Sequence, residues 1–187
     1  MEQEIQKCVK LLEEGKVILY PTDTVWGIGC DATNKDAVQR IYDIKQRQES
    51  KSMLILLDKE DKLPLYVKRI PLITWDLLPL TDRPTTFIYP NAQNLPDIIT
   101  GHDGSIAIRI VKSGFCQQLI KAFGKPIVST SANISGTPAP SAYADISPII
   151  HERMDYVVPK SYDASTFVKP SRIIKLTDDY NFTIVRE

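Results

Sequence analysis

Short apolar runs that end at proline or at polar turns are the feature that most limits how this 187-residue chain can fold. Residues 17–20 stop at Pro21 and residues 85–89 stop at Pro90, whereas 127–130 leads into a polar turn that contains Ser131, Asn133 and Ser135. Runs of this length, bounded by turn residues, are typical of buried β-strands.

Segments with apolar residues three and four positions apart lie between these runs and predict helices. The predicted helices cover 3–14, 34–44, 113–124 and 143–152. Asn34 and Ser113 are residue types that cap helix N-termini, and Gly15 suits a C-cap. Prolines divide 58–83 into short helical pieces and interrupt the last helix at Pro148.

The strand pattern continues to the end of the chain. Predicted strands cover 17–20, 27–30, 53–57, 85–89, 106–111, 127–130, 156–158, 166–168, 172–176 and 182–185. Strands and helices alternate first and strands then accumulate, which predicts an α/β fold: a twisted, mixed-direction sheet with flanking helices. No repeat or linker interrupts the pattern, so we expect a single domain over 1–187.

Composition narrows the class of protein further. Hydrophobic residues make up 43% of the chain, enough for a sizeable core, which argues against disorder. The 23 basic and 23 acidic residues cancel, which argues against a general polyanion binder, so any phosphate contact needs a local cluster of charge. The longest aliphatic run is 53–57, far short of the roughly 20 residues of a membrane span. With no signal peptide visible, we expect a cytoplasmic protein without a membrane partner.

The cysteines and histidines are too few and too scattered for a metal site. Cys8, Cys30 and Cys116 lie far apart, and the only histidines are His102 and His151. A structural zinc site needs about four close ligands, usually in pairs, so neither zinc nor a disulfide framework is expected. Three buried thiols in a reducing compartment are the expectation instead.

The sequence argues against a dinucleotide-binding loop and against a hydrolase nucleophile. Residues 27–32 match GxGxxA, but a dinucleotide-binding loop must open a helix, and the predicted helix begins only after Asn34. Close packing of strand backbones explains these glycines better. The chain has no GxxxxGK[ST] loop and no GxSxG turn, so neither a phosphate-loop NTPase nor a serine hydrolase is indicated.

Three polar segments remain, two of them directly after apolar strands. They are 21–24, the cationic group of Lys45, Arg47 and Lys51, and 129–133. Ligands of open α/β sheets bind beyond the carboxyl ends of the strands. Arginine, lysine, hydroxyl and amide groups together are typical of a polyphosphate site, so the residues alone predict a phosphate or nucleotide ligand.

These segments, in this order and spacing, resemble the YrdC-like (YrdC/YciO) family over nearly the whole chain. The resemblance rests on Pro21-Thr22-Asp23-Thr24-Val25-Trp26-Gly27, Lys45-x-Arg47 with Lys51, 105–109, 129–136, 165–166 and 183–186. It implies a twisted mixed sheet that curves around a positively charged cavity.

The resemblance also implies an activity. Characterised members are threonylcarbamoyl-AMP synthases, which combine L-threonine, bicarbonate and ATP and release pyrophosphate. Their product supplies the threonylcarbamoyl group that a separate threonylcarbamoyl-transferase complex places on tRNA. Mg²⁺ is expected with the ATP, held mainly by phosphates and water.

Site residues carry over by motif only. The ATP-binding set would be Lys45, Arg47, Ser105, Ser131, Asn133 and Arg186. The threonine-binding set would be Thr24, Lys51, Arg109, Ser129 and Ser165. No protein nucleophile and no protein metal ligand is implied, because positioning and charge carry such a transfer. Gln48 and Ser52 replace prolines of the usual pattern, and Arg83 adds a cation that could reach phosphate.

Two alternatives stay open at this point. Members of the YciO branch suggest a non-catalytic module that binds tRNA or double-stranded RNA, although that branch lacks a good KxR and SxN set. A third interpretation is that the chain carbamoylates a different amine. Substrate profiling across amino acids would distinguish this activity from that of the synthase.

Overall fold

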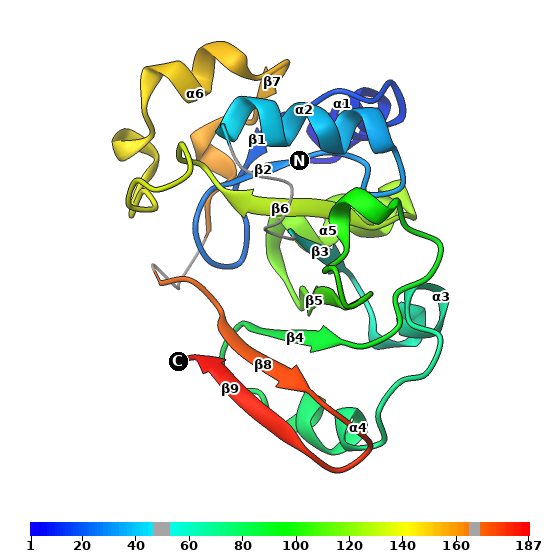
Figure 1. Cartoon of the computed structure of the whole chain (residues 1–187). Helices are drawn as coiled ribbons and strands as arrows, with labels where there is room; N and C mark the ends of the chain where they lie inside the picture. Colours follow the sequence, from blue (N-terminus) through cyan, green and yellow to red (C-terminus); the bar gives the residue numbers. More distant parts are fainter. Residues whose placement is uncertain (47–52, 165–168) are drawn as a thin grey trace.

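The computed structural model describes residues 1–46, 53–164 and 169–187. The described residues form a nine-stranded mixed sheet in the order β7-β1-β2-β6-β3-β5-β4-β8-β9 (Figure 1). The strands are β1 Ile18–Tyr20, β2 Gly27–Gly29, β3 Leu54–Leu57, β4 Thr85–Tyr89, β5 Ile106–Ile110, β6 Ile127–Ser131, β7 Tyr156–Val157, β8 Arg172–Leu176 and β9 Phe182–Arg186. The pairs β1–β7, β3–β5 and β4–β8 are parallel and the other neighbours are antiparallel, so the predicted mixed sheet is confirmed.

Helices flank this sheet. The α-helices are α1 Glu2–Glu13, α2 Lys35–Lys45, α3 Leu63–Tyr66, α4 Ile73–Leu77, α5 Gly114–Phe123 and α6 Pro148–Arg153. Short 3-10 helices are η1 Glu60–Lys62, η2 Leu78–Leu80, η3 Asp97–Ile99, η4 Tyr143–Asp145 and η5 Lys160–Tyr162. The predicted last helix is therefore two pieces, and the second begins at Pro148, because proline suits the first turn of a helix better than its interior.

Strand β1 shows how the sheet carries two apolar cores. Ile18 and Tyr20 pack with α1 and α5 on one face, whereas Leu19 packs with α2 on the other. Successive residues of a strand point to opposite faces, so a run that is apolar throughout must be covered on both sides. This explains why 17–20 reads as a continuous apolar run in the sequence.

The sequence predicts one helix cap correctly and one incorrectly. Asn34 caps α2, because its side chain accepts hydrogen bonds from the backbone N–H groups of Asp36 and Ala37, both at 3.1 Å. Ser113 stands at the N-cap of α5, but its side chain accepts no such bond, so that prediction is wrong. The residue type favours a cap, whereas the rotamer depends on what lies beyond the helix.

Strand boundaries agree closely with the sequence pattern. Strands β4 and β8 coincide with the predicted 85–89 and 172–176, and the others begin or end within a residue or two. The predicted strand 166–168 lies outside the described residues. Gly29 is confirmed as a packing glycine, because a Cβ there would lie 2.5 Å from the Val128 carbonyl oxygen.

Candidate functional site: a cavity with two arginines

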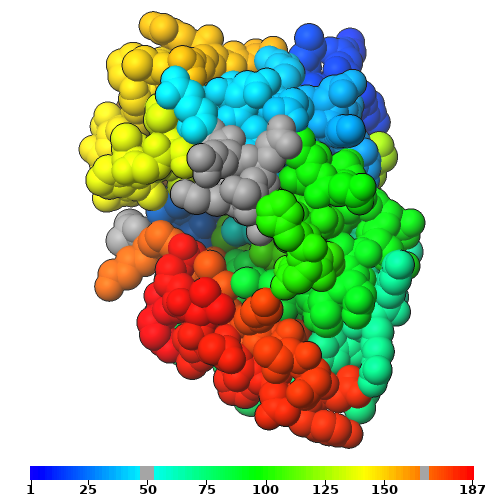
Figure 2. Space-filling view, viewed as in Figure 1, coloured from blue at the N-terminus to red at the C-terminus, as the bar shows by residue number. Residues whose placement is uncertain are grey.

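A cavity of about 330 Å³, which we call the arginine cavity, opens where the strands β2, β6, β3, β5, β4 and β8 meet. In Figure 2 the surface is hollowed between the C-terminal strands, in orange and red, and the yellow and green segments. Its lining residues are Thr24, Val25, Trp26, Gly27, Met53, Leu54, Thr86, Ile88, Ala107, Arg109, Ser129, Thr130, Ser131, Ala139, Pro170, Ser171, Ile173 and Arg186. This lining contains two arginines and no carboxylate, so it favours an anionic ligand.

Arg109 lies on β5, and its guanidinium group forms an ion pair with Asp23. Its Nη2 lies 2.8 Å from Asp23 Oδ1, and only 4% of its side chain is exposed. Its Nε is buried and has no hydrogen-bond partner in the part of the chain that the structure describes. A buried donor without an acceptor is costly, so a ligand oxygen that accepts from it would be stabilising.

Arg186 lies on β9 and is the second cation of the cavity lining. Its Nη2 and Nε donate to the Ser171 carbonyl oxygen at 2.7 and 3.0 Å. Burial lowers the pKa of Arg186 from its ordinary value, and the positive charge of Arg109 lowers it further. Two guanidinium groups that repel each other across one cavity are a place where an anion is stabilised.

Hydroxyl groups also line the cavity. Strand β6 ends in Ser129, Thr130 and Ser131, all of which line the cavity. Thr24 is buried, and its backbone N–H donates to Thr22 Oγ1 at 3.0 Å, which fixes the turn after β1. A Cβ on Gly27 would lie 3.1 Å from Ser129 Oγ, so glycine leaves room for this hydroxyl.

Lys45 lies outside the cavity lining and holds the loop after β6 in place by hydrogen bonds. Its Nζ donates to the carbonyl oxygens of Ser131 and Asn133 at 2.5 and 2.6 Å, and it is 1% exposed. The Ser131 hydroxyl donates to Asn133 Oδ1 at 2.5 Å. Of the sequence-predicted KxR and SxN residues, Ser131 reaches the cavity lining, whereas Lys45 and Asn133 support it from outside.

Other predicted residues lie elsewhere. Ser105 is not among the lining residues, and its hydroxyl donates to Asp103 Oδ1 at 2.5 Å. Arg83 lines a different cavity and pairs with Glu187. Arg47, Gln48, Lys51, Ser52 and Ser165 lie outside the described residues. The structure therefore brings together Thr24, Arg109, Ser129, Ser131 and Arg186.

Thr86, Ser171 and Trp26 are among the cavity residues that the site prediction did not name. Thr86 Oγ1 and Ser171 Oγ lie 2.8 Å apart and hold β4 against the segment before β8. Trp26 donates from Nε1 to Asp163 Oδ2 at 2.7 Å, so it joins the turn before β2 to the segment after η5. Trp26 could have been predicted as a site residue, because it belongs to the 21–27 motif. Ser171 could not, because no sequence motif surrounds this isolated serine.

Metal-ligating side chains do not gather in the described residues. They contain no group of three or more histidine, cysteine, aspartate and glutamate side chains. The three cysteines are buried thiols, as expected, and burial raises the pKa of Cys8 to about 12. Within the described ranges, no helix is long and apolar enough to cross a membrane.

Comparisons with known sequences agree with this geometry. The family model described as "Telomere recombination" (Sua5, YciO and YrdC) matches residues 10–187. A threonylcarbamoyl-AMP synthase of Pseudoalteromonas translucida is 35% identical over 175 residues, covering 92% of each chain. The synthase of Pseudomonas aeruginosa (strain UCBPP-PA14) is 33% identical over 154 residues, covering 82% of this chain and 83% of the relative.

Solved structures have the same fold. P. abyssi Sua5 in complex with L-threonine has a TM-score of 0.91 at 27% identity. It covers 100% of this chain, which spans 54% of that longer protein. E. coli YciO has a TM-score of 0.85 at 26% identity and covers 100% of this chain and 90% of its own. With a matching family model, similar sequences and a shared fold, the chain belongs to the Sua5/YciO/YrdC family.

Proposed function

We propose that this chain is a threonylcarbamoyl-AMP synthase that combines L-threonine, bicarbonate and ATP. The observation that carries the proposal is the arginine cavity, whose lining combines Arg109 and Arg186 with the hydroxyl groups of β6. Relatives named threonylcarbamoyl-AMP synthase, which match over 92% and 82% of the chain, support the catalytic reading over an RNA-binding module.

The chemistry is an adenylyl transfer, so the enzyme is a nucleotidyltransferase. The threonine amine and bicarbonate form a carbamate with loss of water. A carbamate oxygen attacks the α-phosphorus of ATP, and the bond to the β-phosphate oxygen breaks to release pyrophosphate. No protein nucleophile is needed, because positioning and charge stabilisation carry such a transfer.

The proposal assigns a role to each group of polar residues in and behind the cavity lining. The buried Nε of Arg109 receives the threonine carboxylate, with Thr24 and Ser129 beside it. Arg186 and Ser131 face the ATP phosphates, and Lys45 and Asn133 hold the loop that carries Ser131. Arg47, Lys51 and Ser165 belong to the proposed set by their motifs alone.

In this proposal Mg²⁺ is bound by the ATP and not by a separate protein site. No carboxylate lines the cavity, and carboxylates are the usual protein ligands of Mg²⁺, so the described residues do not fit a protein-held ion. ATP phosphates and water would coordinate it. The proposal also includes a cytoplasmic location and transfer of the product by a separate threonylcarbamoyl-transferase complex to tRNA, which this chain need not itself bind.

Two arginine variants test the assignment of the site. Arg186→Gln removes a cation from the cavity lining, and by analogy with a lost preorganised donor we expect kcat/KM to fall about 10²–10³-fold. Arg172→Gln is the matched control, because Arg172 lies on the neighbouring strand β8 outside the lining. Formation of threonylcarbamoyl-AMP is followed by mass spectrometry. Equal activity of the two variants would remove Arg186 from the site.

A further inference from the structure

Exposed apolar side chains gather on the β8–β9 hairpin and on the segment that runs beside it. Ten large apolar residues are exposed in the described part of the chain, and seven of them lie in 72–80 or 180–185. The two segments are neighbours, because the Ile73 N–H donates to the Asp179 carbonyl oxygen at 2.9 Å and Arg83 pairs with Glu187. Clustered apolar surface of this kind marks an interaction site.

Strand register explains why the hairpin leaves apolar surface open. Ile184 lies opposite Ile174 and Phe182 lies opposite Leu176, so each pair projects from the same face of the sheet. Ile174 and Leu176 belong to the core against which α4 and η2 pack. Phe182 and Ile184 lie one strand farther out and expose 43% and 49% of their surfaces. The face that is core on β8 is therefore exposed apolar surface on β9.

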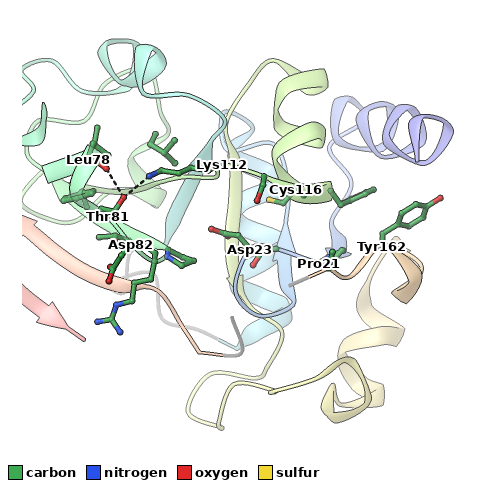
Figure 3. Close-up of a pocket in the computed structure, with 18 residues that line it drawn as sticks. Pro21, Asp23, Leu78, Thr81, Asp82, Lys112, Cys116 and Tyr162 are labelled. Atoms are coloured by element: carbon green, nitrogen blue, oxygen red, sulfur yellow. Dashed lines mark hydrogen bonds between the residues drawn. The ribbon is translucent and has the colours of Figure 1, made fainter. Parts of the chain in front are cut away.

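Hydrogen bonds fix the segment beside the hairpin. The Thr81 hydroxyl donates to the Leu78 carbonyl oxygen at 2.9 Å and accepts from Lys112 Nζ at 3.0 Å (Figure 3). The bond from Ile73 to the β8–β9 turn fixes its other end. The apolar side chains of this segment therefore belong to a defined surface.

Strand β9 is also an open edge of the sheet (Figure 1). The Thr177 N–H donates to the Asn181 carbonyl oxygen at 3.0 Å, and hydrogen-bonded and non-hydrogen-bonded pairs alternate along antiparallel strands. The backbone groups of Thr183 therefore point to β8, whereas those of Phe182 and Ile184 point outward. Lysine and proline commonly protect such edges, but β9 contains neither, and its bulge lies beyond Ile184.

The two ends of the hairpin carry opposite net charge. Carboxylates outnumber cations by one around the turn, where the charged residues are Asp178, Asp179 and Arg69. Cations outnumber carboxylates by one at the other end, where they are Arg83, Arg172, Arg186, Asp82 and Glu187. An antiparallel strand of the same sequence would place its acidic turn beside this arginine-rich end. The edge is therefore complementary in charge to a second copy of itself.

We propose that β9 pairs antiparallel with β9 of a second copy of this chain, with Phe182 opposite Ile184 of the second copy. In this register the outward backbone groups of both residues find partners, and a two-fold axis passes beside Thr183. The exposed apolar faces of the two hairpins become one continuous surface, and each shields the other from water. This assignment does not depend on the threonylcarbamoyl-AMP synthase activity.

Sedimentation velocity of the full chain tests the proposal. The expected species has twice the 21.1 kDa mass of the chain. Contacts along one strand belong to the small and weak class of interfaces, so we expect a dimer Kd in the micromolar range. A single-chain mass at about 500 µM, well above that range, overturns the proposal. An assembly larger than two chains also overturns it, because an interface with two-fold symmetry closes as a dimer.

One pair of variants locates the interface. Ile184→Lys should raise the dimer Kd at least about tenfold, because it removes an apolar side chain from the contact in both copies. Leu65→Lys is the matched control, because Leu65 is 53% exposed and lies on α3, and it should dimerise like the unaltered chain. Melting temperatures confirm that both variants are folded. Equal dimerisation of the two variants overturns the proposal.

A second pair of variants tests the register. Thr183 would face its own copy at a Cα–Cα distance of about 4.5 Å, which a disulfide can bridge. Mild oxidation with diamide should therefore convert Thr183→Cys to a covalent dimer, and the three native cysteines are buried. Tyr180→Cys is the control, because Tyr180 is 74% exposed but would lie far from its own copy. No cross-link with Thr183→Cys, or equal cross-linking of both variants, overturns the proposal.

Discussion

At the scale of single residues, the pairing of Asp23 with Arg109 is the contact on which the arginine cavity most depends. Asp23 and Arg109 expose 14% and 4% of their side chains, and Arg186 brings a second positive charge to the same cavity. Asp23 compensates one of these charges from behind the lining. Without it, the buried guanidinium group of Arg109 would have no counter-ion and would share a cavity with a second arginine and no carboxylate in the lining.

Removal of the Asp23 charge should therefore destabilise the fold. Asp23→Asn leaves Arg109 buried without a counter-ion, and we expect the free energy of unfolding to fall by about 3 kcal/mol or more. Asp179→Asn is the matched control, because its partner Arg69 is 75% exposed, and an exposed pair contributes about 0–1 kcal/mol. Urea denaturation measures both, and equal losses would contradict this account of the pair.

The pKa of Asp103 gives a second test at this scale. Hydrogen bonds from Ser105, and then the Lys175 ammonium, lower its pKa from 3.8 to about 2. Because the pKa in the folded state is lowered, the stabilisation is present above pH 3.8 and is lost as the pH falls toward 2. Ser105→Ala should raise the pKa of Asp103 toward 3.8, as measured by carboxyl carbon-13 NMR. The carboxylate of Asp178, which accepts from Tyr180 and Asn181 instead, should titrate as before.

The family resemblance identified several residues that line one cavity, but it did not predict how each side chain points. Arg109, Ser131 and Arg186 line one cavity, as the family resemblance implied. Lys45 belongs to the same motif but donates to the backbone of the Ser131–Asn133 loop, because the end of α2 packs behind β6. Which way a side chain points follows from strand register and helix packing, and neither is written in a motif.

At the scale of secondary-structure elements, apolar periodicity and turn residues located the strands well. Strands β4 and β8 match their predicted bounds, because each is an apolar run that starts beside a polar turn. The pairing of β4 with β5 and with β8 could not be predicted, since it joins residues about 20 and about 85 positions apart, respectively, through tertiary packing. That pairing creates the cavity wall that includes Thr86 and Ser171.

The two helix N-caps allow a matched comparison. Asn34→Ala removes two capping hydrogen bonds from α2 and should lower the free energy of unfolding by about 1 kcal/mol. Ser113→Ala removes no cap bond from α5, so we expect a change within about 0.5 kcal/mol. Thermal and urea unfolding of the two variants measure the difference, and a larger loss for Ser113→Ala would refute the assignment of the caps.

At the scale of the whole molecule, a chain with zero net charge places two cations and no carboxylate in the lining of the arginine cavity. The sequence holds 23 basic and 23 acidic residues, yet the arginine cavity is lined by two arginines and no acid. Net charge therefore gives no indication of which ligands such a sheet binds.

Threonine-dependent release of pyrophosphate tests the central claim most directly. The purified chain is incubated with ATP, Mg²⁺ and bicarbonate, with and without L-threonine, and pyrophosphate is measured over time. The account predicts release only when threonine is present, matched by an equal amount of threonylcarbamoyl-AMP. Release that does not depend on threonine, or no release under either condition, would contradict it.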